Sequence, residues 1–235
     1  MNYLEKVGVE TETRFWVNNP SIEECGLAIN SGAVACTTNP AFCSKLFQSD
    51  PEYINAVVKK IVKEEPEVDA AAEKVYHTIA GELMKLFLPV YEKSGGKYGF
   101  VTVQEDPRKE ENTQYILEAS LRSHKMGVNF MSKIPVTVPG LKVIKEMVKH
   151  NIPICATEVF SLSQAAEAYR VYEKSAKLSG NRPPLFITHI TGIMDQYFAD
   201  LASKEKLDVS PEVLKVAGTA IALKEYRMIK RKGWA

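Results

Sequence analysis

The sequence predicts an α/β fold of the barrel type, organised as one domain over residues 1–235. Short apolar segments rich in β-branched and aromatic residues alternate with longer helical patterns, which is typical of βαβ units and a parallel sheet. The glycine-rich motifs GxGxxG and GxxxxGK[ST], which mark doubly wound nucleotide-binding sheets, do not occur. The length of 235 residues fits a single barrel, because such folds run to roughly 250 residues as one unit.

Six segments have the composition of strands. The first is followed by the turn signal Asn18-Asn19-Pro20 and the second by Thr38-Asn39-Pro40. The predicted strands cover residues 14–17, 33–37, 99–103, 128–134, 153–157 and 185–188.

Helical patterns fill the intervals between these segments. Ser21 and Glu24 form a capping box at the start of the first helix. A long helical region over residues 41–93 is interrupted at Asp50-Pro51 and Glu65-Pro66, where each proline can begin a new helix. The later helices are predicted over 112–125, 139–150, from a cap at Ser161 or Ser163 to 178, 195–203, and 210–231.

Composition excludes several classes of partner. Thirty Lys and Arg residues against 29 Asp and Glu leave a net charge of +1, which predicts no nucleic-acid partner. No apolar run approaches the roughly 18 residues of a membrane span, and the N-terminus lacks the apolar segment of a signal peptide, so no membrane partner is predicted. Four cysteines without a CxxC pair are typical of a reduced, cytoplasmic protein.

Polar side chains follow the predicted strands, at the ends where a barrel carries its chemistry. These residues are Asn18, Thr38, Asn39, Gln104, Glu105, Lys133, Thr157, Thr188 and His189. Lys133 lies in the apolar segment 130–135, which would hold its amine within or just above the barrel interior. Desolvation lowers the pKa of a lysine, and a neutral amine is the nucleophile that forms a Schiff base with a carbonyl substrate.

A structural interpretation of the same residues stays open. A lysine at a strand end can extend to solvent while its methylene chain covers apolar surface. The small polar residues are common in turns, and Asn39 before Pro40 has the composition of a turn start.

Three motifs resemble the transaldolase family, which includes the small fructose-6-phosphate aldolases. They are Thr37-Thr38-Asn39-Pro40, the Lys133 segment followed by Gly140-Leu141, and Thr157 followed by Phe160-Ser161-Leu162-Ser163-Gln164-Ala165. The likeness extends from about Phe15 to the last helix. It implies a (β/α)8 TIM-type barrel and class I aldol chemistry of the pentose phosphate pathway and carbohydrate metabolism, without a cofactor.

The resemblance also implies roles for single residues. Lys133 would form the Schiff base with a dihydroxyacetone unit of a sugar or sugar-phosphate substrate, and Gln104 and Thr157 would hold a catalytic water. Asn39 would bind donor hydroxyls. The further substrate-binding candidates are Thr38, Ser161, Thr188 and His189.

Three positions depart from the family pattern. Asn18 stands where the family has a catalytic acid/base aspartate, and an amide cannot transfer that proton, so water, Glu105 or another group would have to do so. Cys155 replaces an asparagine. Ile193 stands where the family has an arginine that binds the substrate phosphate. This difference predicts a substrate with little or no phosphate, or a substrate that is bound through other groups.

The strand count falls short of a closed barrel. Eight strands close such a barrel, and six in the chain would leave the first and last as open edges. A miscounted strand, a partial chain or covering oligomer contacts would each account for this, and we expect a partial chain lacking strands 7 and 8. A homo-oligomer is also expected, because relatives of the short branch form rings of subunits.

The sequence therefore supports two main hypotheses. The first is a Schiff-base aldolase or transaldolase, and the second is a non-catalytic relative that keeps the scaffold for binding. A metal-dependent aldolase is less favoured, because the four histidines are scattered and form no ligand set: His77, His124, His150 and His189.

Overall fold

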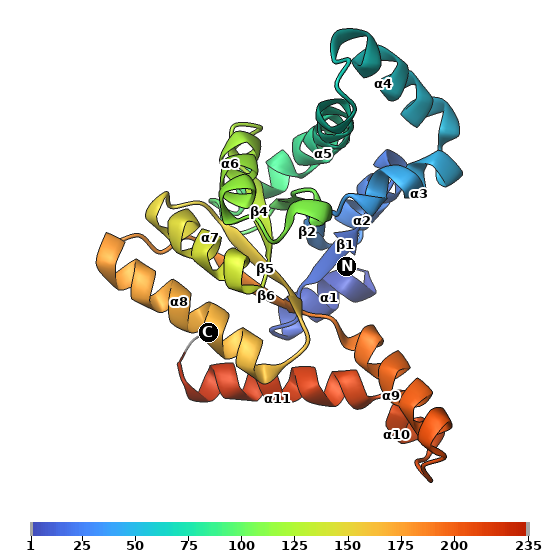
Figure 1. The fold of residues 1–235 in the computed structure, drawn as a ribbon, viewed down its shortest axis with the longest axis vertical. Helices are drawn as coiled ribbons and strands as arrows, with labels where there is room; N and C mark the ends of the chain where they lie inside the picture. Colours follow the sequence, from blue (N-terminus) through green and yellow to red (C-terminus); the bar gives the residue numbers. More distant parts are fainter. Residues whose placement is uncertain (1, 234–235) are drawn as a thin grey trace. The chain divides into compact units, whose positions relative to one another are not determined.

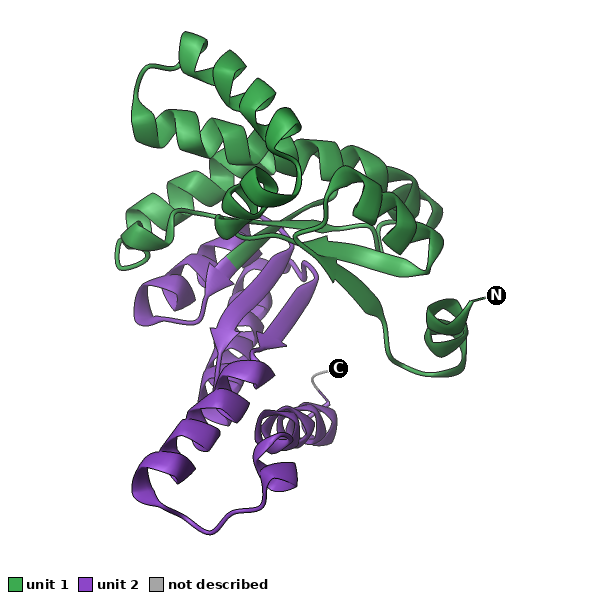
Figure 2. Cartoon of the chain, turned by 90° about the vertical axis from the view of Figure 1, so that its right-hand side faces the viewer, with its two compact units in different colours: residues 1–133 green, residues 134–235 purple. Residues whose placement is uncertain are grey.

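The computed structural model describes residues 2–233, and Met1, Trp234 and Ala235 lie outside the described residues. Two compact units make up the chain, residues 1–133 and 134–235, and the boundary falls within one strand (Figure 2). The prediction of a single domain stays a prediction. Within the described residues, no helix combines the length and apolar character needed to cross a membrane.

Six strands alternate with helices along the chain, as the sequence predicts (Figure 1). They are β1 (Phe15–Asn18), β2 (Ala33–Thr37), β3 (Val101–Gln104), β4 (Phe130–Pro135), β5 (Ile154–Val159) and β6 (Leu185–His189). In the first unit β1, β2, β3 and β4 pair in that order, and in the second unit β5 pairs with β6, all in parallel. The predicted α/β alternation is confirmed.

The helices of the first unit follow the predicted breaks, with two additions, at residues 3–10 and 107–109. They are α1 (Tyr3–Glu10), α2 (Ile22–Asn30), α3 (Ala41–Ser49), α4 (Pro51–Glu64), α5 (Val68–Lys93), the 3-10 helix η1 (Pro107–Lys109) and α6 (Thr113–His124). The capping box of Ser21 and Glu24 is present. Helix α1 was not predicted, although Asn2 and Glu5 form the same kind of capping box at its start. Pro66 does not begin a helix, because α5 starts two residues later with Glu67 as its cap.

In the second unit the final predicted helix is divided. The helices are α7 (Val138–Lys149), α8 (Leu162–Ser179), α9 (Thr191–Glu205), α10 (Pro211–Leu214) and α11 (Ala217–Arg231). Gly218 packs directly on the backbone of Thr191, where a Cβ would lie 2.1 Å from the carbonyl oxygen, and its N–H donates to the Asp195 carboxylate at 2.7 Å. This tertiary contact with the start of α9 sets where α11 begins, and a helical pattern alone does not reveal it.

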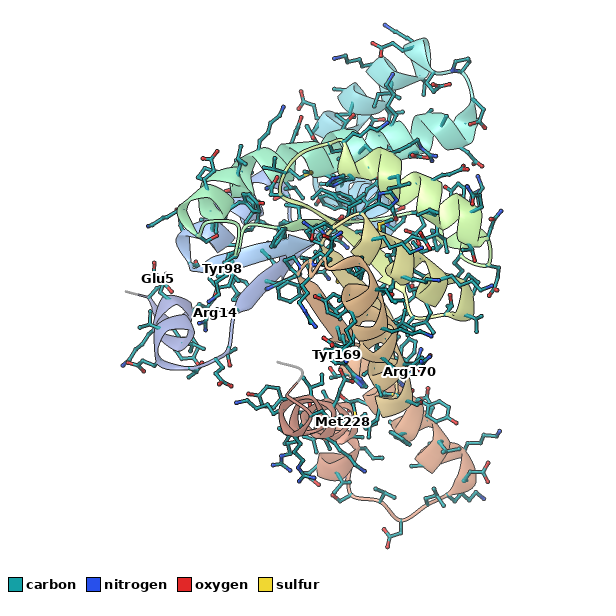
Figure 3. All side chains as sticks on the ribbon, turned by 90° about the vertical axis from the view of Figure 1, so that its left-hand side faces the viewer. Glu5, Arg14, Tyr98, Tyr169, Arg170 and Met228 are labelled. Atoms are coloured by element: carbon teal, nitrogen blue, oxygen red, sulfur yellow. The ribbon has the colours of Figure 1, made fainter. Side chains whose placement is uncertain are left out.

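In the first unit, a side-chain hydrogen bond lies next to the start of β1, and apolar side chains of the helices form the core. Arg14, just before β1, donates from Nε to the Tyr98 hydroxyl at 3.0 Å, and Figure 3 shows the two side chains together. Large apolar side chains from α3, α4 and α5 are fully buried, including Phe42, Ile54 and Phe87. Burial of such side chains stabilises each by about 1.5–3 kcal/mol, so this packing supports the strands that carry the site.

Candidate functional site

The Lys133 side chain lies on the inner face of β4. Every residue of this strand is buried, and Lys133 is 9% exposed. The preceding residue, Ser132, donates its hydroxyl to Ser120 of α6 at 2.8 Å, so Lys133 projects from the opposite face of the strand. Its Nζ donates to the carbonyl oxygen of Thr38 at 3.1 Å. The amine is therefore held inside the first unit, away from bulk water.

Gln104 is the neighbour of Lys133 in the sheet. The two residues are register partners on β3 and β4, so their side chains share one face of the sheet. Gln104 is 7% exposed and Thr38 is fully buried. Three residues that the sequence places in the site, Lys133, Gln104 and Thr38, are thus brought together within the first unit.

Tyr76 of α5 links the ends of β2 and β3 through one hydroxyl group. The Thr38 hydroxyl donates to the Thr102 carbonyl at 2.6 Å, so it accepts from the Tyr76 hydroxyl, also at 2.6 Å. The Tyr76 oxygen in turn accepts the N–H of Gln104 at 3.1 Å. Burial raises the pKa of Tyr76 well above its usual range, which keeps the phenol protonated. Sequence reasoning missed this residue, because a tyrosine on the apolar face of a long helix is typical of core packing.

We expect Tyr76→Phe to destabilise the chain by about 2 kcal/mol, because the buried Gln104 N–H is left without its acceptor. Urea unfolding measures the change. Tyr3→Phe is the matched control, since Tyr3 is 78% exposed and should unfold like the wild type. A Tyr76→Phe free energy of unfolding within about 0.5 kcal/mol of wild type would contradict the role of this hydroxyl.

Asn39 follows Thr38 and offers an unused acceptor. Its backbone N–H donates to the Asn19 side chain at 3.1 Å, and the N–H of Asn19 donates to the carbonyl of Thr37 at 2.9 Å. The Asn39 side-chain oxygen is buried and has no hydrogen-bond partner among residues 2–233. A buried unsatisfied oxygen in a native site calls for a ligand or a water. Asn18, the last residue of β1, is exposed.

A bulge in β5 presents Thr157 in the second unit. Thr157 is 4% exposed, the β5–β6 register shifts just after Ala156, and Glu158 has a φ of 59°. The Gln164 amide holds this bulge, since Nε2 donates to the Glu158 carbonyl at 3.1 Å and Oε1 accepts the Phe160 N–H at 3.0 Å. Bulges of this kind re-aim side chains next to functional sites. Gln164 belongs to the third motif of the sequence, but the sequence pattern alone gives it no role.

Ser161 and Thr188 both have structural hydrogen bonds in the second unit. Ser161, the first of the two predicted caps, accepts the Gln164 N–H at 3.3 Å at the start of α8. The Thr188 hydroxyl donates to the Ala156 carbonyl at 3.1 Å. Their roles in substrate binding stay predictions.

His189, at the end of β6, pairs with Glu225 of α11. His189 Nδ1 lies 3.0 Å from Glu225 Oε2, with side-chain exposures of 5% and 6%. Burial raises the pKa of Glu225, and the nearby His189 opposes that rise. His189 Nε2 is buried without a partner in the described part of the chain. Sequence reasoning missed Glu225, although it lies seven residues after Gly218, on the same buried face of α11.

We expect the wild type to lose stability relative to Glu225→Gln as the pH rises above 4.5, the ordinary pKa of this carboxyl. Because the pKa of Glu225 is raised in the folded protein, the unfolded chain releases this proton at a lower pH than the folded chain does. The stabilisation that comes from the protonated, buried carboxyl is therefore complete below the ordinary pKa and is lost as the pH rises through the raised pKa. Unfolding in urea at a series of pH values measures the difference, and His189 is common to both proteins. A difference that stays constant or grows in favour of the wild type would show that the charged pair outweighs the cost of burial.

The other two positions that depart from the family pattern, Ile193 and Cys155, lie in the second unit. Ile193, on α9, is 53% exposed, and Cys155, on β5, is fully buried. No group of three or more His, Cys, Asp and Glu side chains within residues 2–233 is arranged to hold a metal ion.

Known proteins are similar to this chain over most of its length. The sequence profile of the Transaldolase/Fructose-6-phosphate aldolase family matches residues 15–234. A transaldolase of Neisseria gonorrhoeae is 27% identical over 224 residues, covering 89% of this chain and 61% of that protein. Transaldolases of Neisseria meningitidis serogroup C (26% identity; 80% of this chain, 58% of the relative) and Mycobacterium bovis (24%; 83% and 55%) are similar over comparable lengths.

The chain spans less than two thirds of the length of these relatives, 58% and 61% for the two Neisseria proteins. Its described residues contain six parallel strands, against the eight of a complete TIM barrel. The predicted fold class, an α/β fold of the TIM-barrel type without strands 7 and 8, is confirmed. With its strand order, its Lys133 segment and a profile match over residues 15–234, the chain belongs to the transaldolase/fructose-6-phosphate aldolase family.

Proposed function

We propose that the chain is a class I aldol enzyme that moves a dihydroxyacetone-type unit from a ketose to an aldehyde through a Schiff base on Lys133. The observation that carries this proposal is the buried position of the Lys133 amine, 9% exposed and beside the in-register Gln104. A buried ammonium is costly, so removal from water favours the neutral, nucleophilic amine.

The proposed chemistry begins when the neutral amine adds to the ketone carbonyl. With a proton taken up from the solvent, water leaves and an iminium forms. Cleavage of the adjacent carbon–carbon bond sends its electron pair into the iminium to form an enamine, while the hydroxyl on the departing carbon gives up its proton and that fragment leaves as an aldehyde. The enamine then adds to an acceptor aldehyde, whose oxygen takes up a proton, and water hydrolyses the resulting iminium to release the product, the free amine and a proton.

Other residues support the proposal with complementary roles. The unpartnered oxygen of Asn39 suits a donor hydroxyl of the substrate. By the resemblance to the family, Gln104 binds the water of imine hydrolysis, and the role of Thr157, in the second unit, stays a prediction of the sequence. Asn18 cannot accept the proton of the cleavage step, so another group or water does so.

Borohydride reduction tests the proposal directly. The full chain is treated with dihydroxyacetone or fructose 6-phosphate and borohydride, and peptide mass spectrometry locates the adduct. We expect a triose-derived mass on Lys133, and none on the exposed Lys85. The absence of an adduct on Lys133 with every ketose tested would refute the proposal.

The residues Asn18, Cys155 and Ile193, which depart from the family pattern, favour a second candidate, a scaffold that has lost catalysis. Asn18→Asp separates the two hypotheses: a gain in aldol activity identifies a working lysine, whereas no activity in either protein favours the scaffold. A homo-oligomeric state and a cytoplasmic location remain predictions of the sequence.

A further inference from the structure

Hydrogen bonds surround Thr38, the residue whose carbonyl oxygen accepts from the Lys133 amine. Thr38 is fully buried and lies one residue beyond the end of β2, so the pairing of β2 with β3 does not by itself fix its carbonyl. The carbonyl oxygen nevertheless lies 3.1 Å from the lysine Nζ. Contacts outside the strand ladder must therefore hold it in that position.

Thr102, a fully buried residue of β3, holds Thr38 at two points. The Thr38 N–H donates to the Thr102 hydroxyl oxygen at 2.9 Å, and the Thr38 hydroxyl donates to the Thr102 carbonyl at 2.6 Å. One contact engages the backbone of Thr38 and the other its side chain. Together they restrict rotation of Thr38 relative to β3.

Tyr76 of α5 holds Thr38 from another element. Its hydroxyl donates to the Thr38 hydroxyl oxygen and accepts the Gln104 N–H, so both hydrogen-bonding roles of the phenol are used. Helix α5 packs against both β2 and β3. The phenol cannot turn away without breaking one of these bonds, and it therefore joins a long helix to the carbonyl beside the lysine.

A fixed carbonyl has a direct effect on a lysine nucleophile. A neutral amine has two N–H groups and one lone pair, and it turns about its Cε–Nζ bond. When one N–H is bound to the Thr38 carbonyl, fewer directions stay open to the lone pair. An amine oriented in this way loses less entropy when it attacks a ketone carbon.

The same carbonyl suits the iminium that follows. One amine hydrogen and a proton from the solvent leave with the ketone oxygen as water, so the iminium nitrogen keeps one N–H and gains a positive charge. A hydrogen bond from a charged N–H to a carbonyl oxygen is stronger than one from a neutral amine. An acceptor already in place therefore stabilises the charge as it develops.

We propose that the main-chain carbonyl of Thr38 orients the Lys133 amine and then accepts the N–H of its iminium, and that Tyr76 and Thr102 are the positioning residues that fix this carbonyl. The inference rests on the proposed function. Tyr76 and Thr102 act through Thr38, because their hydrogen bonds go to Thr38 and the bond to the amine comes from the Thr38 carbonyl.

Tyr76→Phe tests the inference in the full chain, under conditions where the variant is folded. The reaction is the addition of dihydroxyacetone to glyceraldehyde. We expect kcat to fall about tenfold to a hundredfold, because the carbonyl is displaced from the amine. KM for dihydroxyacetone should stay within about threefold of wild type, since the lost interaction acts on the reacting nitrogen. The rate of borohydride trapping on Lys133 should fall together with kcat.

Tyr53→Phe is the matched control. The Tyr53 hydroxyl also binds α5, but it donates to the Glu82 carboxylate. Its removal should lower the free energy of unfolding and leave kcat within about twofold of wild type. A loss of stability alone would therefore not account for a loss of kcat in Tyr76→Phe.

A second pair of variants tests the other support and serves if Tyr76→Phe fails to fold. Thr102→Val keeps the shape of the side chain but removes the acceptor of the Thr38 N–H, and it should reproduce the loss in kcat at a similar KM. Thr102→Ser keeps the hydroxyl and should retain kcat within about threefold.

The outcomes separate this inference from the proposed function. If a Lys133 adduct forms in the wild type, but folded Tyr76→Phe and Thr102→Val keep kcat and the trapping rate within about twofold, the positioning role is overturned and the proposed function stands. A rise in KM at constant kcat would overturn it in the same way. The absence of a Lys133 adduct in the wild type would refute the proposed function and, with it, this inference.

Discussion

Replacement of Lys133 by methionine is expected to abolish Schiff-base formation and lower kcat/KM by about 10³-fold or more, while the fold is retained. Methionine has a similar length and no amine, so it fills the same space without the nucleophile. The variant loses the hydrogen bond to the Thr38 carbonyl, but it also avoids the cost of burying a polar amine. These effects oppose each other, and we expect the free energy of unfolding to change by less than about 1 kcal/mol.

A large loss in kcat/KM together with a small change in the free energy of unfolding would show that Lys133 acts in catalysis and is not needed to stabilise the fold. Lys85→Met is the matched control, because Lys85 is exposed on α5, and both its activity and its stability should match the wild type. A structural lysine would give the reverse pattern: Lys133→Met would lower stability by more than about 2 kcal/mol, and no borohydride adduct would form in the wild type.

Gly140→Ala is expected to be the most damaging small substitution for the fold. A Cβ at this position would lie 1.9 Å from the Pro135 carbonyl oxygen, closer than real contacts allow, and the obstacle is backbone. Thr137 caps α7 by accepting the Gly140 N–H at 3.2 Å, so the helix start cannot move away without losing its cap. We expect a loss of about 3 kcal/mol in the free energy of unfolding.

Thermal unfolding provides the measurement. A loss of this size should lower Tm by about 6–12 °C for a chain of this length. Gly26→Ala in α2 is the control, since nothing lies within 4 Å of its Cβ position and alanine in a helix should stabilise by about 0.5–1 kcal/mol. Equal melting temperatures for the two variants would contradict the close approach of α7 to the end of β4.

The Gly140 contact gives a physical reason for the glycine in one motif of the sequence. In the Lys133 segment followed by Gly140-Leu141, α7 begins directly on the end of β4 and leaves no room for a side chain there. Sequence reasoning used the motif without its physical cause. The same holds for Gln164, whose amide holds the β5 bulge beside Thr157.

Local patterns alone determined the strands, most helix starts and the polar strand ends of this chain. Alternating composition, prolines and capping boxes act over a few residues, so Lys133, Gln104 and Thr38 were predictable from neighbours in the sequence. Tertiary structure alone decided which distant side chains complete each cluster. Tyr76 reaches Thr38 from another element, and Glu225 reaches His189 across 36 residues, because burial and hydrogen bonding depend on packing, which short-range periodicity does not specify.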